Sequence, residues 1–150
     1  MNDLDIRPAA LTDIPAIVAM LADDPLGAQR ESLDDLAPYD AAFRRLAGDP
    51  NQHLVVAVRE TRVVGTLQLT IVPGLSRRGA TRSVIEGVRV HADERSSGLG
   101  TQLIQWAVDE SRRQGCQLAQ LTSDASRTDA HRFYERLGFT PSHVGFKLAL

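Results

Sequence analysis

A glycine-rich turn in the second half of the chain has the residue types needed to bind a phosphate group. Arg95 is followed three and five residues later by Gly98 and Gly100, and an amphipathic stretch begins directly after them. Glycine lets the backbone approach a ligand closely. The first amides of a helix are unpaired and carry partial positive charge, so they attract anions. The turn therefore predicts an anion site, with the Arg95 guanidinium and the Thr101 hydroxyl beside it.

Other motifs for phosphate binding or nucleophilic catalysis are absent from the sequence. There is no GxxxxGKS or GxxxxGKT loop and no GxGxxG with an acid about 20 residues further on. There is no GxSxG, and Cys116 has no activating histidine or basic cluster beside it. A glycine pair at a helix start can also be a simple cap, so the turn alone leaves that structural alternative open.

The elements that must position this turn alternate between strand and helix patterns. Strand patterns fall at residues 4–7, 53–60, 62–72, 83–91, 116–123 and 143–150. Helical patterns fall at 13–22, around Phe43 and Leu46, at 98–114 and at 128–138. Thr12 is expected to cap the first helix, Gly115 to end the third, and Gly87 to mark a bulge or a close backbone approach. The order predicts a mixed α/β sheet flanked by helices, in a single domain over residues 1–150.

Composition narrows the class of protein. The 150 residues are 43% hydrophobic and 24% charged, which is typical of a globular domain and not of a disordered or fibrous chain. No apolar run approaches the roughly 18 residues that cross a bilayer, and the first residues do not resemble a signal peptide. One cysteine excludes an intrachain disulfide and favours a cytoplasmic location. The net charge of −2 argues against a globally basic nucleic-acid binder. We therefore expect no membrane, nucleic-acid or metal partner.

Two motifs, taken together, resemble those of the GCN5-related N-acetyltransferase (GNAT) superfamily. The turn from Arg95 to Gly100 is similar to the family's acyl-CoA-binding pattern, Arg/Gln-x-x-Gly-x-Gly/Ala. Residues 130–139 are similar to its second landmark, A-x-x-F-Y-x-x-x-G-F, and residues 6–14 resemble its first strand and helix. The resemblance covers nearly the whole chain. It implies the GNAT fold, a splayed sheet with a bulged fourth strand, and acetyl-CoA as cosubstrate with no metal.

The resemblance also implies which residues contact coenzyme A. The strand at 83–91 would pair its backbone with the pantetheine arm, and the turn would hold the pyrophosphate. The implied set is Val88, Arg89, Val90, Arg95, Ser96, Ser97, Gly98, Leu99, Gly100, Thr101, Arg127 and Phe133. The two valines are equally explained as core residues. Many members carry Asn where this chain has Arg127, which could instead reach a coenzyme A phosphate or lie in solvent.

Tyr134 matches the family's usual general acid. Coenzyme A leaves as a thiolate when an amine attacks the thioester. A phenol with a pKa of about 10 can donate a proton or a hydrogen bond to a thiolate whose conjugate thiol has a pKa of about 8.5. The structural alternative is a core aromatic beside Phe133.

Glu86 is the candidate general base, because an alkyl ammonium has a pKa of about 10 and must lose a proton. It lies in an apolar strand, where burial would raise its pKa. Alternation places Glu86 on the side of Val88 and Val90, unless the bulge near Gly87 changes this. The alternative is a structural acid paired with an arginine such as Arg89 or Arg82.

The predicted function is acetyl transfer from acetyl-CoA to a primary amine of a small molecule, by direct attack in a ternary complex. A peptide or protein amine is one alternative acceptor, and a non-catalytic acyl-CoA-binding module is another function. Acids in the segment 23–40 could attract a cationic amine or form a solvated loop; they are Asp23, Asp24, Glu31, Asp34, Asp35 and Asp40. Residues 143–150 are apolar enough for a homodimer contact, although core packing would explain them equally well.

Overall fold

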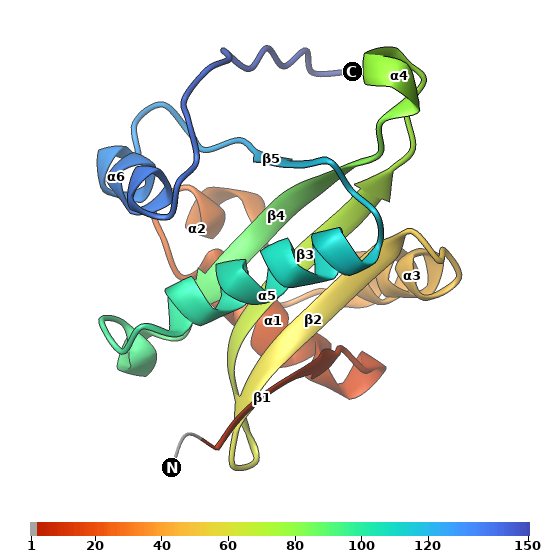
Figure 1. Cartoon of the computed structure of the whole chain (residues 1–150). Helices are drawn as coiled ribbons and strands as arrows, with labels where there is room; N and C mark the ends of the chain where they lie inside the picture. Colours follow the sequence, from red (N-terminus) through yellow and green to blue (C-terminus); the bar gives the residue numbers. More distant parts are fainter. Residues whose placement is uncertain (1–2) are drawn as a thin grey trace. The chain divides into compact units, whose positions relative to one another are not determined.

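The structure is a computed structural model that describes residues 3–150. The chain forms two compact units, one ending at Gln120 and one running from Leu121 to Leu150. The first unit contains nearly the whole sheet, and the second contains the last helix (Figure 1).

Five strands form one open sheet in the order β1-β2-β3-β4-β5, and the pairs from β1 to β4 are antiparallel. The strands are β1 (Leu4–Pro8), β2 (Gln52–Arg59), β3 (Arg62–Val72), β4 (Arg82–Val90) and β5 (Leu118–Leu121). The helices are α1 (Ile14–Ala22), α2 (Gly27–Arg30), α3 (Ala37–Ala47), α4 (Ser76–Gly79), α5 (Leu99–Arg113) and α6 (Thr128–Arg136), with the short turns η1 (Leu11–Asp13) and η2 (Ala92–Glu94). The predicted mixed α/β fold, a sheet flanked by helices, is confirmed.

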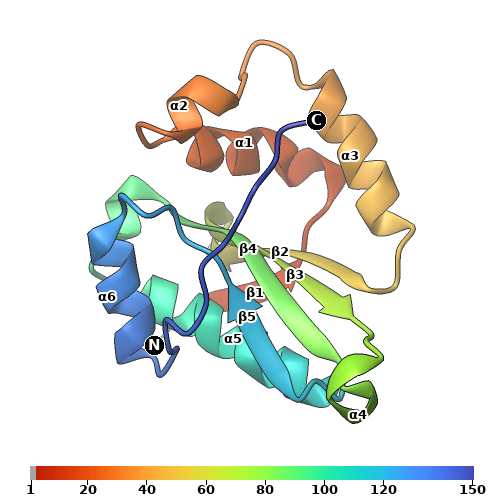
Figure 2. The same cartoon turned by 90° about the horizontal axis from the view of Figure 1, so that it is seen from above.

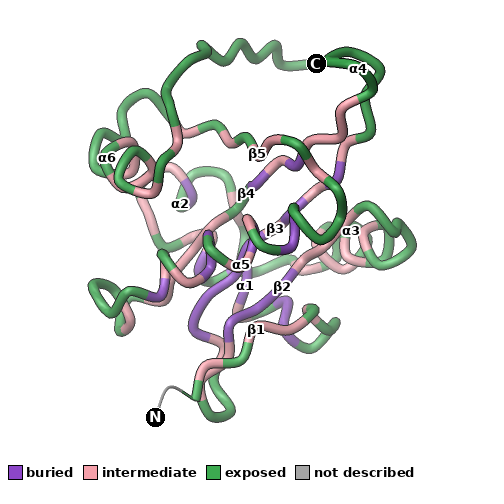
Figure 3. Tube along the Cα trace, viewed as in Figure 1, coloured by how far each residue is buried: buried purple, intermediate pink, exposed green. Residues whose placement is uncertain are grey.

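The two faces of the sheet carry different helices. Figure 2 shows α1, α2 and α3 on one side of the first unit and α5 on the other. Ser83 on β4 is buried and bonds Ser111 on α5 through their hydroxyls, 2.7 Å apart. Side chains alternate along a strand. Ser83 and Ile85 therefore face α5, and their neighbours face the side of α1. Burial is concentrated on the central strands and on the helix faces against them (Figure 3).

Helix α1 begins at a different cap from the one predicted. Thr12 lies inside η1, and Asp13 accepts the Ala10 amide at 2.7 Å and the Arg7 guanidinium at 2.8 and 3.2 Å. The arginine and the amide hold the pKa of the Asp13 carboxyl below its ordinary value, against the opposing effect of burial. Asp13 therefore stands at the N-cap position of α1, but its side chain accepts no amide of this helix and instead anchors the segment before it.

Three other boundaries differ from the predictions. Residues 143–150 form no strand and are all exposed, because a strand pattern needs a neighbouring ladder to pair with. The predicted loop at 23–40 contains α2 and the start of α3. Strand β5 is shorter than the predicted 116–123. The strand patterns at 53–60 and 62–72 are separated by Thr61 alone, which predicts a tight hairpin, and the pairing of β2 with β3 confirms it. The end of α5 at Gly115, whose φ is +81°, is confirmed as well.

Candidate active site

The turn between β4 and α5 has the geometry of an anion-binding helix start. Ser96 and Gly98 have left-handed backbone, with φ of 67° and 85°, and they fold the chain back before α5 begins. A Cβ built on Gly98 would meet no heavy atom within 4 Å, so the space beside it is open. Leu99 is 1% exposed and fixes the helix start in the core. The turn therefore faces open space, while the first residue of the helix, Leu99, is fixed in the core.

The first amides of α5 come from the predicted segment. The amide of Gln102 bonds the carbonyl of Gly98 at 3.2 Å, the first bond of this helix. The amides of residues 99–101 precede that bond, and first-turn amides have no partner within their own helix. Thr101 is exposed beside them. The structure thus gathers the residues from Arg95 to Thr101 at one helix N-terminus, where a phosphate group fits.

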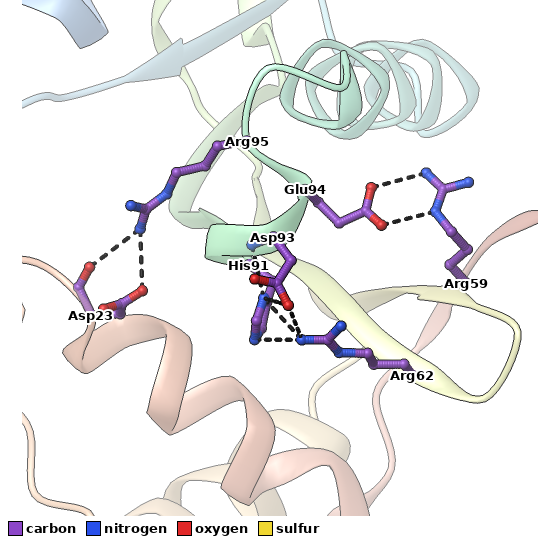
Figure 4. Close-up of polar contacts among 7 residues, drawn as sticks. All are labelled: Asp23, Arg59, Arg62, His91, Asp93, Glu94 and Arg95. Carbon is purple, nitrogen blue, oxygen red and sulfur yellow. Dashed lines mark hydrogen bonds and ion pairs between the residues drawn. The ribbon is translucent and has the colours of Figure 1, made fainter.

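Arg95 is exposed and reaches back to the end of α1. Its Nη2 lies 3.2 Å from the Asp23 carboxylate, and both side chains are more than half exposed, at 58% and 59% (Figure 4). An exposed ion pair of this kind contributes little free energy. The Arg95 guanidinium can therefore exchange this partner for a phosphate at small cost.

Two ion pairs from the β2–β3 hairpin fasten the segment before the turn. Arg59 binds Glu94 through two bonds of 3.1 and 3.2 Å, and Arg62 binds Asp93 at 2.8 Å (Figure 4). The Arg62 guanidinium lowers the pKa of Asp93, and it also contacts the His91 ring. These positioning residues were not predicted. The partners lie 35 and 31 residues apart in sequence, and no local pattern relates them.

Strand β4 contains the predicted bulge. The register with β3 shifts between Thr66 and Gln68, so one residue of β3 opposes two of β4, Gly87 and Val88. Gly87 has a φ of 60°, in the left-handed region that favours glycine. A bulge redirects the side chains that follow it.

The bulge changes the expected side of Glu86. Glu86 pairs with Gln68, and Arg89 pairs with Thr66, so Glu86 and Arg89 share the face that carries α1. Val90 lies on the other face, which corrects the simple alternation that placed it beside Glu86. Glu86 is exposed, so the burial expected for it is not found.

Arg89 is bound by a loop acid and not by Glu86. Its Nη2 lies 3.3 Å from the Asp24 carboxylate, its Nη1 donates to the Val88 carbonyl at 2.9 Å, and both charged side chains are about one-fifth exposed. Among residues 3–150 no ion pair joins Glu86 to Arg89 or Arg82, the two arginines named as examples of a structural partner. Val88 and Val90 are half-buried.

The acidic segment is therefore largely engaged within the protein. Asp23 pairs with Arg95, and Asp24 pairs with Arg89 and accepts the Gly27 amide at 2.5 Å. Glu31 accepts the Tyr39 hydroxyl at 3.1 Å. Asp23 and Asp24 tie the segment after α1 to the glycine-rich turn and to β4, a role that the charge count alone did not indicate.

The second unit holds the predicted general acid. Tyr134 lies on α6 and is half-buried between Phe133 and Phe139, with ring centroids 5.2 and 5.9 Å away. Arg127 directly precedes α6 and is exposed. The aromatic cluster orients the phenol ring and explains why both landmark aromatics occur together.

The fold and these residues define an acetyltransferase. Residues 15–139 match the acetyltransferase (GNAT) family, and the chain belongs to this family. It is an acetyl-CoA-dependent N-acetyltransferase, so the alternative of a non-catalytic binding module is set aside.

Three relatives illustrate the similarity. An aminoalkylphosphonate N-acetyltransferase from Salmonella typhimurium is 33% identical over 146 residues, covering 97% of this chain and 91% of that protein. A glucosamine 6-phosphate N-acetyltransferase from Trypanosoma brucei is 38% identical over 89 residues, covering 59% of this chain and 58% of that protein. A crystal structure described as a transcriptional regulator from Bacillus halodurans is 44% identical, with a TM-score of 0.94 and coverage of 98% of this chain and 99% of that one.

No helix within residues 3–150 is long and apolar enough to cross a membrane. The same residues contain no group of three or more histidine, cysteine or acidic side chains able to hold a metal ion. Burial raises the pKa of the Cys116 thiol, which disfavours the reactive thiolate form.

Proposed function

We propose that this protein transfers an acetyl group from acetyl-CoA to a primary amine of a small molecule, by direct attack in a ternary complex. The observation that carries the proposal is the open turn with left-handed backbone at the start of α5, which follows the bulge at Gly87 in β4. The family match runs across the boundary between the two units, which supports a single N-acetyltransferase domain.

Donor binding is assigned to the turn and to β4. The free amides of residues 99–101 and the Arg95 guanidinium would bind the pyrophosphate, with the backbone of Ser96 and Gly98 shaping the turn. The backbone of Val88 and the residues that follow it would pair with the pantetheine arm. The remaining proposed donor contacts are Arg89, Val90, Ser97, Leu99, Gly100, Thr101, Arg127 and Phe133.

Catalysis rests on positioning and on proton transfer. The amine nitrogen forms a bond to the thioester carbon as the carbon–sulfur bond breaks, and Tyr134 supplies a proton to the leaving thiolate. Backbone amides at the β4 bulge would polarise the carbonyl oxygen. Glu86 would take the amine's proton, directly or through water, since it is exposed on the face of α1.

The acceptor is an amine that also carries a phosphonate or phosphate group. Two relatives are named for such acceptors, an aminoalkylphosphonate and glucosamine 6-phosphate. Both molecules carry a primary amine and a phosphorus oxyanion in the same small molecule. The chain contains 17 basic residues, 16 of them arginine, the residue best suited to bidentate binding of such an anion.

The cell compartment and the assembly state are part of the proposal. A chain with one cysteine suits a reducing cytoplasm. Residues 143–150 expose alternate apolar side chains, with Phe146 at 93% and Leu148 at 84%. A second copy of the chain would bury this row, which supports a homodimer.

The test is thiol release from acetyl-CoA across a panel of amines, with wild type and Tyr134→Phe side by side. The panel contains 2-aminoethylphosphonate, glucosamine 6-phosphate, propylamine, a polyamine and a lysine peptide. We expect the two phosphorus-bearing amines to react fastest, and Tyr134→Phe to lower kcat while acetyl-CoA still binds. A preference for the lysine peptide would refute the small-molecule assignment. Unchanged turnover in Tyr134→Phe would remove this residue from the mechanism.

The proton acceptor is tested separately by a pH–rate profile. Glu86→Gln should lose the acidic limb of the kcat/KM profile, because that limb reports the essential base. A variant that keeps the limb would show that another group accepts the proton.

A further inference from the structure

A row of polar side chains crosses the sheet face on the side of α1. On β2 and β3, the Gln52 carbonyl oxygen accepts the Gln68 amide at 3.0 Å and the Thr70 hydroxyl at 2.9 Å. The register places Glu86 of β4 directly opposite Gln68. All these side chains are half-buried or exposed. On the same face, Val56 and Leu54 of β2 instead pack against the apolar side chains of α1.

Arg82 lies at the far end of the same row. It pairs with Val72 on β3, and alternation from Ser83 places it on the face of Glu86. The residue is half-buried, and within residues 3–150 its buried Nε has no hydrogen-bond partner. A buried donor without an acceptor is costly. The Nε and the adjacent Nη form the edge of the guanidinium that binds an oxyanion through two parallel bonds.

The charges along the row are arranged as a dipole. Next to Arg82 in sequence, the β3–β4 connection carries Arg77 and Arg78, both exposed. Glu86 stands at the other end, next to the bulge. The Cα atoms of Arg82 and Glu86 are about 13 Å apart along the strand, and both side chains are long enough to lean toward each other. A short molecule with a cation at one end and an anion at the other could bridge Glu86 and Arg82 across Val84, the half-buried residue between them on this face.

Arg89, on the same face, is already neutralised. Its two terminal nitrogens are held by the Asp24 carboxylate and by the Val88 carbonyl, although its buried Nε, like that of Arg82, has no hydrogen-bond partner within residues 3–150. No carboxylate within residues 3–150 forms an ion pair with Arg82. Arg82 is therefore the better placed of the two arginines to bind an added anion.

We propose that Arg82, at the end of the Gln52–Gln68–Thr70 row, binds the phosphonate or phosphate group of the acceptor and so selects zwitterionic amines. This inference rests on the proposed function, because it locates part of that same acceptor site. The Arg82 guanidinium donates from its Nε edge to the oxyanion, and the row orients the part of the acceptor that lies between the two charged groups. The amine then lies beside Glu86 and the bulge.

The test compares acceptors that differ in the anion. KM is measured for 2-aminoethylphosphonate and for propylamine, at saturating acetyl-CoA, in wild type, Arg82→Gln, Arg82→Lys and Arg45→Gln. Arg45 lies exposed on α3, so its variant removes the same charge away from the row. Inhibition by methylphosphonate against propylamine gives a second, direct readout of anion binding. Thermal unfolding shows whether each variant is folded.

Loss of a charge-assisted bidentate contact should raise KM for 2-aminoethylphosphonate about tenfold to a hundredfold in Arg82→Gln. Propylamine kinetics and the Arg45→Gln variant should be unchanged, and Arg82→Lys should fall between. Methylphosphonate inhibition should disappear in Arg82→Gln. Equal effects on both amines, or intact methylphosphonate inhibition in the folded variant, would overturn the assignment of Arg82.

Failure of the broader proposal gives a different result. If wild type acetylates propylamine as efficiently as 2-aminoethylphosphonate, the proposed acceptor class is wrong. Methylphosphonate inhibition that depends on Arg82 would then still support an anion site. If methylphosphonate does not inhibit wild type, the proposed anion site is wrong as well.

Discussion

Replacing Gly87 by alanine tests whether the β4 bulge is required for activity. Gly87 has a φ of 60°, and a Cβ added there would meet only the Leu21 side chain, at 3.9 Å. That is an ordinary contact, so crowding contributes nothing to the cost. Only the backbone conformation opposes the added methyl group.

The magnitude follows from that conformation. An L-residue in the left-handed region costs about 1–2 kcal/mol, which lowers the Tm of a chain of this size by about 2–8 °C. The chain can relieve this cost by abandoning the bulge, which shifts the register of β4 by one residue. The amides and side chains around the thioester would then be misplaced, and an error of about 1 Å can cost about a hundredfold in rate. We expect kcat/KM to fall by about ten- to a hundredfold.

Gly115→Ala is the matched control. Gly115 has a φ of 81° with no atom within 4 Å of an added Cβ, and it lies after α5, outside the proposed site. Both variants should show similar losses of Tm by differential scanning calorimetry, and only Gly87→Ala should lose activity in the thiol-release assay. If Gly87→Ala loses the same stability as the control and keeps full turnover, the bulge has no part in presenting the thioester.

Three further predictions concern other parts of the molecule. Asp13→Asn should cost about 1.5–3 kcal/mol at pH 7. Because the pKa of Asp13 is lowered in the folded protein, this stability is present above pH of about 4 and lost as pH falls through the folded pKa. Urea unfolding at pH 7 and below pH 4 should show a smaller difference in unfolding free energy between wild type and variant at the lower pH, and a constant difference would contradict the linkage. Arg95→Gln should weaken acetyl-CoA binding about tenfold and reduce its salt dependence, whereas Asp23→Asn should strengthen binding by at most about fivefold; calorimetric titration in two salt concentrations measures both, and an unchanged Kd for Arg95→Gln would exclude it from the donor site. Phe146→Glu should leave Tm nearly unchanged and convert a wild-type dimer to a monomer in light scattering, and a monomeric wild type would refute the proposed homodimer.

Local patterns predicted much of the fold correctly. The hairpin between β2 and β3, the amphipathic helix α5 and its end at Gly115 depend on neighbours within a few residues. Gly87 was recognised as a bulge because a glycine inside an apolar strand has few other uses. The segment from Arg95 to Gly100 contains its own turn geometry, so its position at a helix start was also predictable.

Properties that depend on distant partners were not predicted. Residues 143–150 alternate as a strand does, yet form none, because a strand exists only with a ladder to bond to. Thr12 is a good cap by type, but Asp13 stands at the N-cap position, and its side chain binds Arg7 and the Ala10 amide and not the helix. The acidic segment after α1 suggested a solvated or amine-attracting loop. Asp23 and Asp24 instead bind two arginines that lie 72 and 65 residues further along the sequence.

The sequence by itself determined the residues on which the proposed chemistry rests: a glycine-rich turn, a tyrosine in an aromatic helix and a glutamate on a glycine-interrupted strand. These depend on residue type and short spacing, which the chain carries in any conformation. Only the tertiary structure decided which side chains share a face. The extra residue at the bulge shifts the alternation of β4, so that Glu86 and Arg89 lie together on the face of α1 while Val90 lies on the face of α5. The register with β3 sets that arrangement, and the register exists only after the strands have paired.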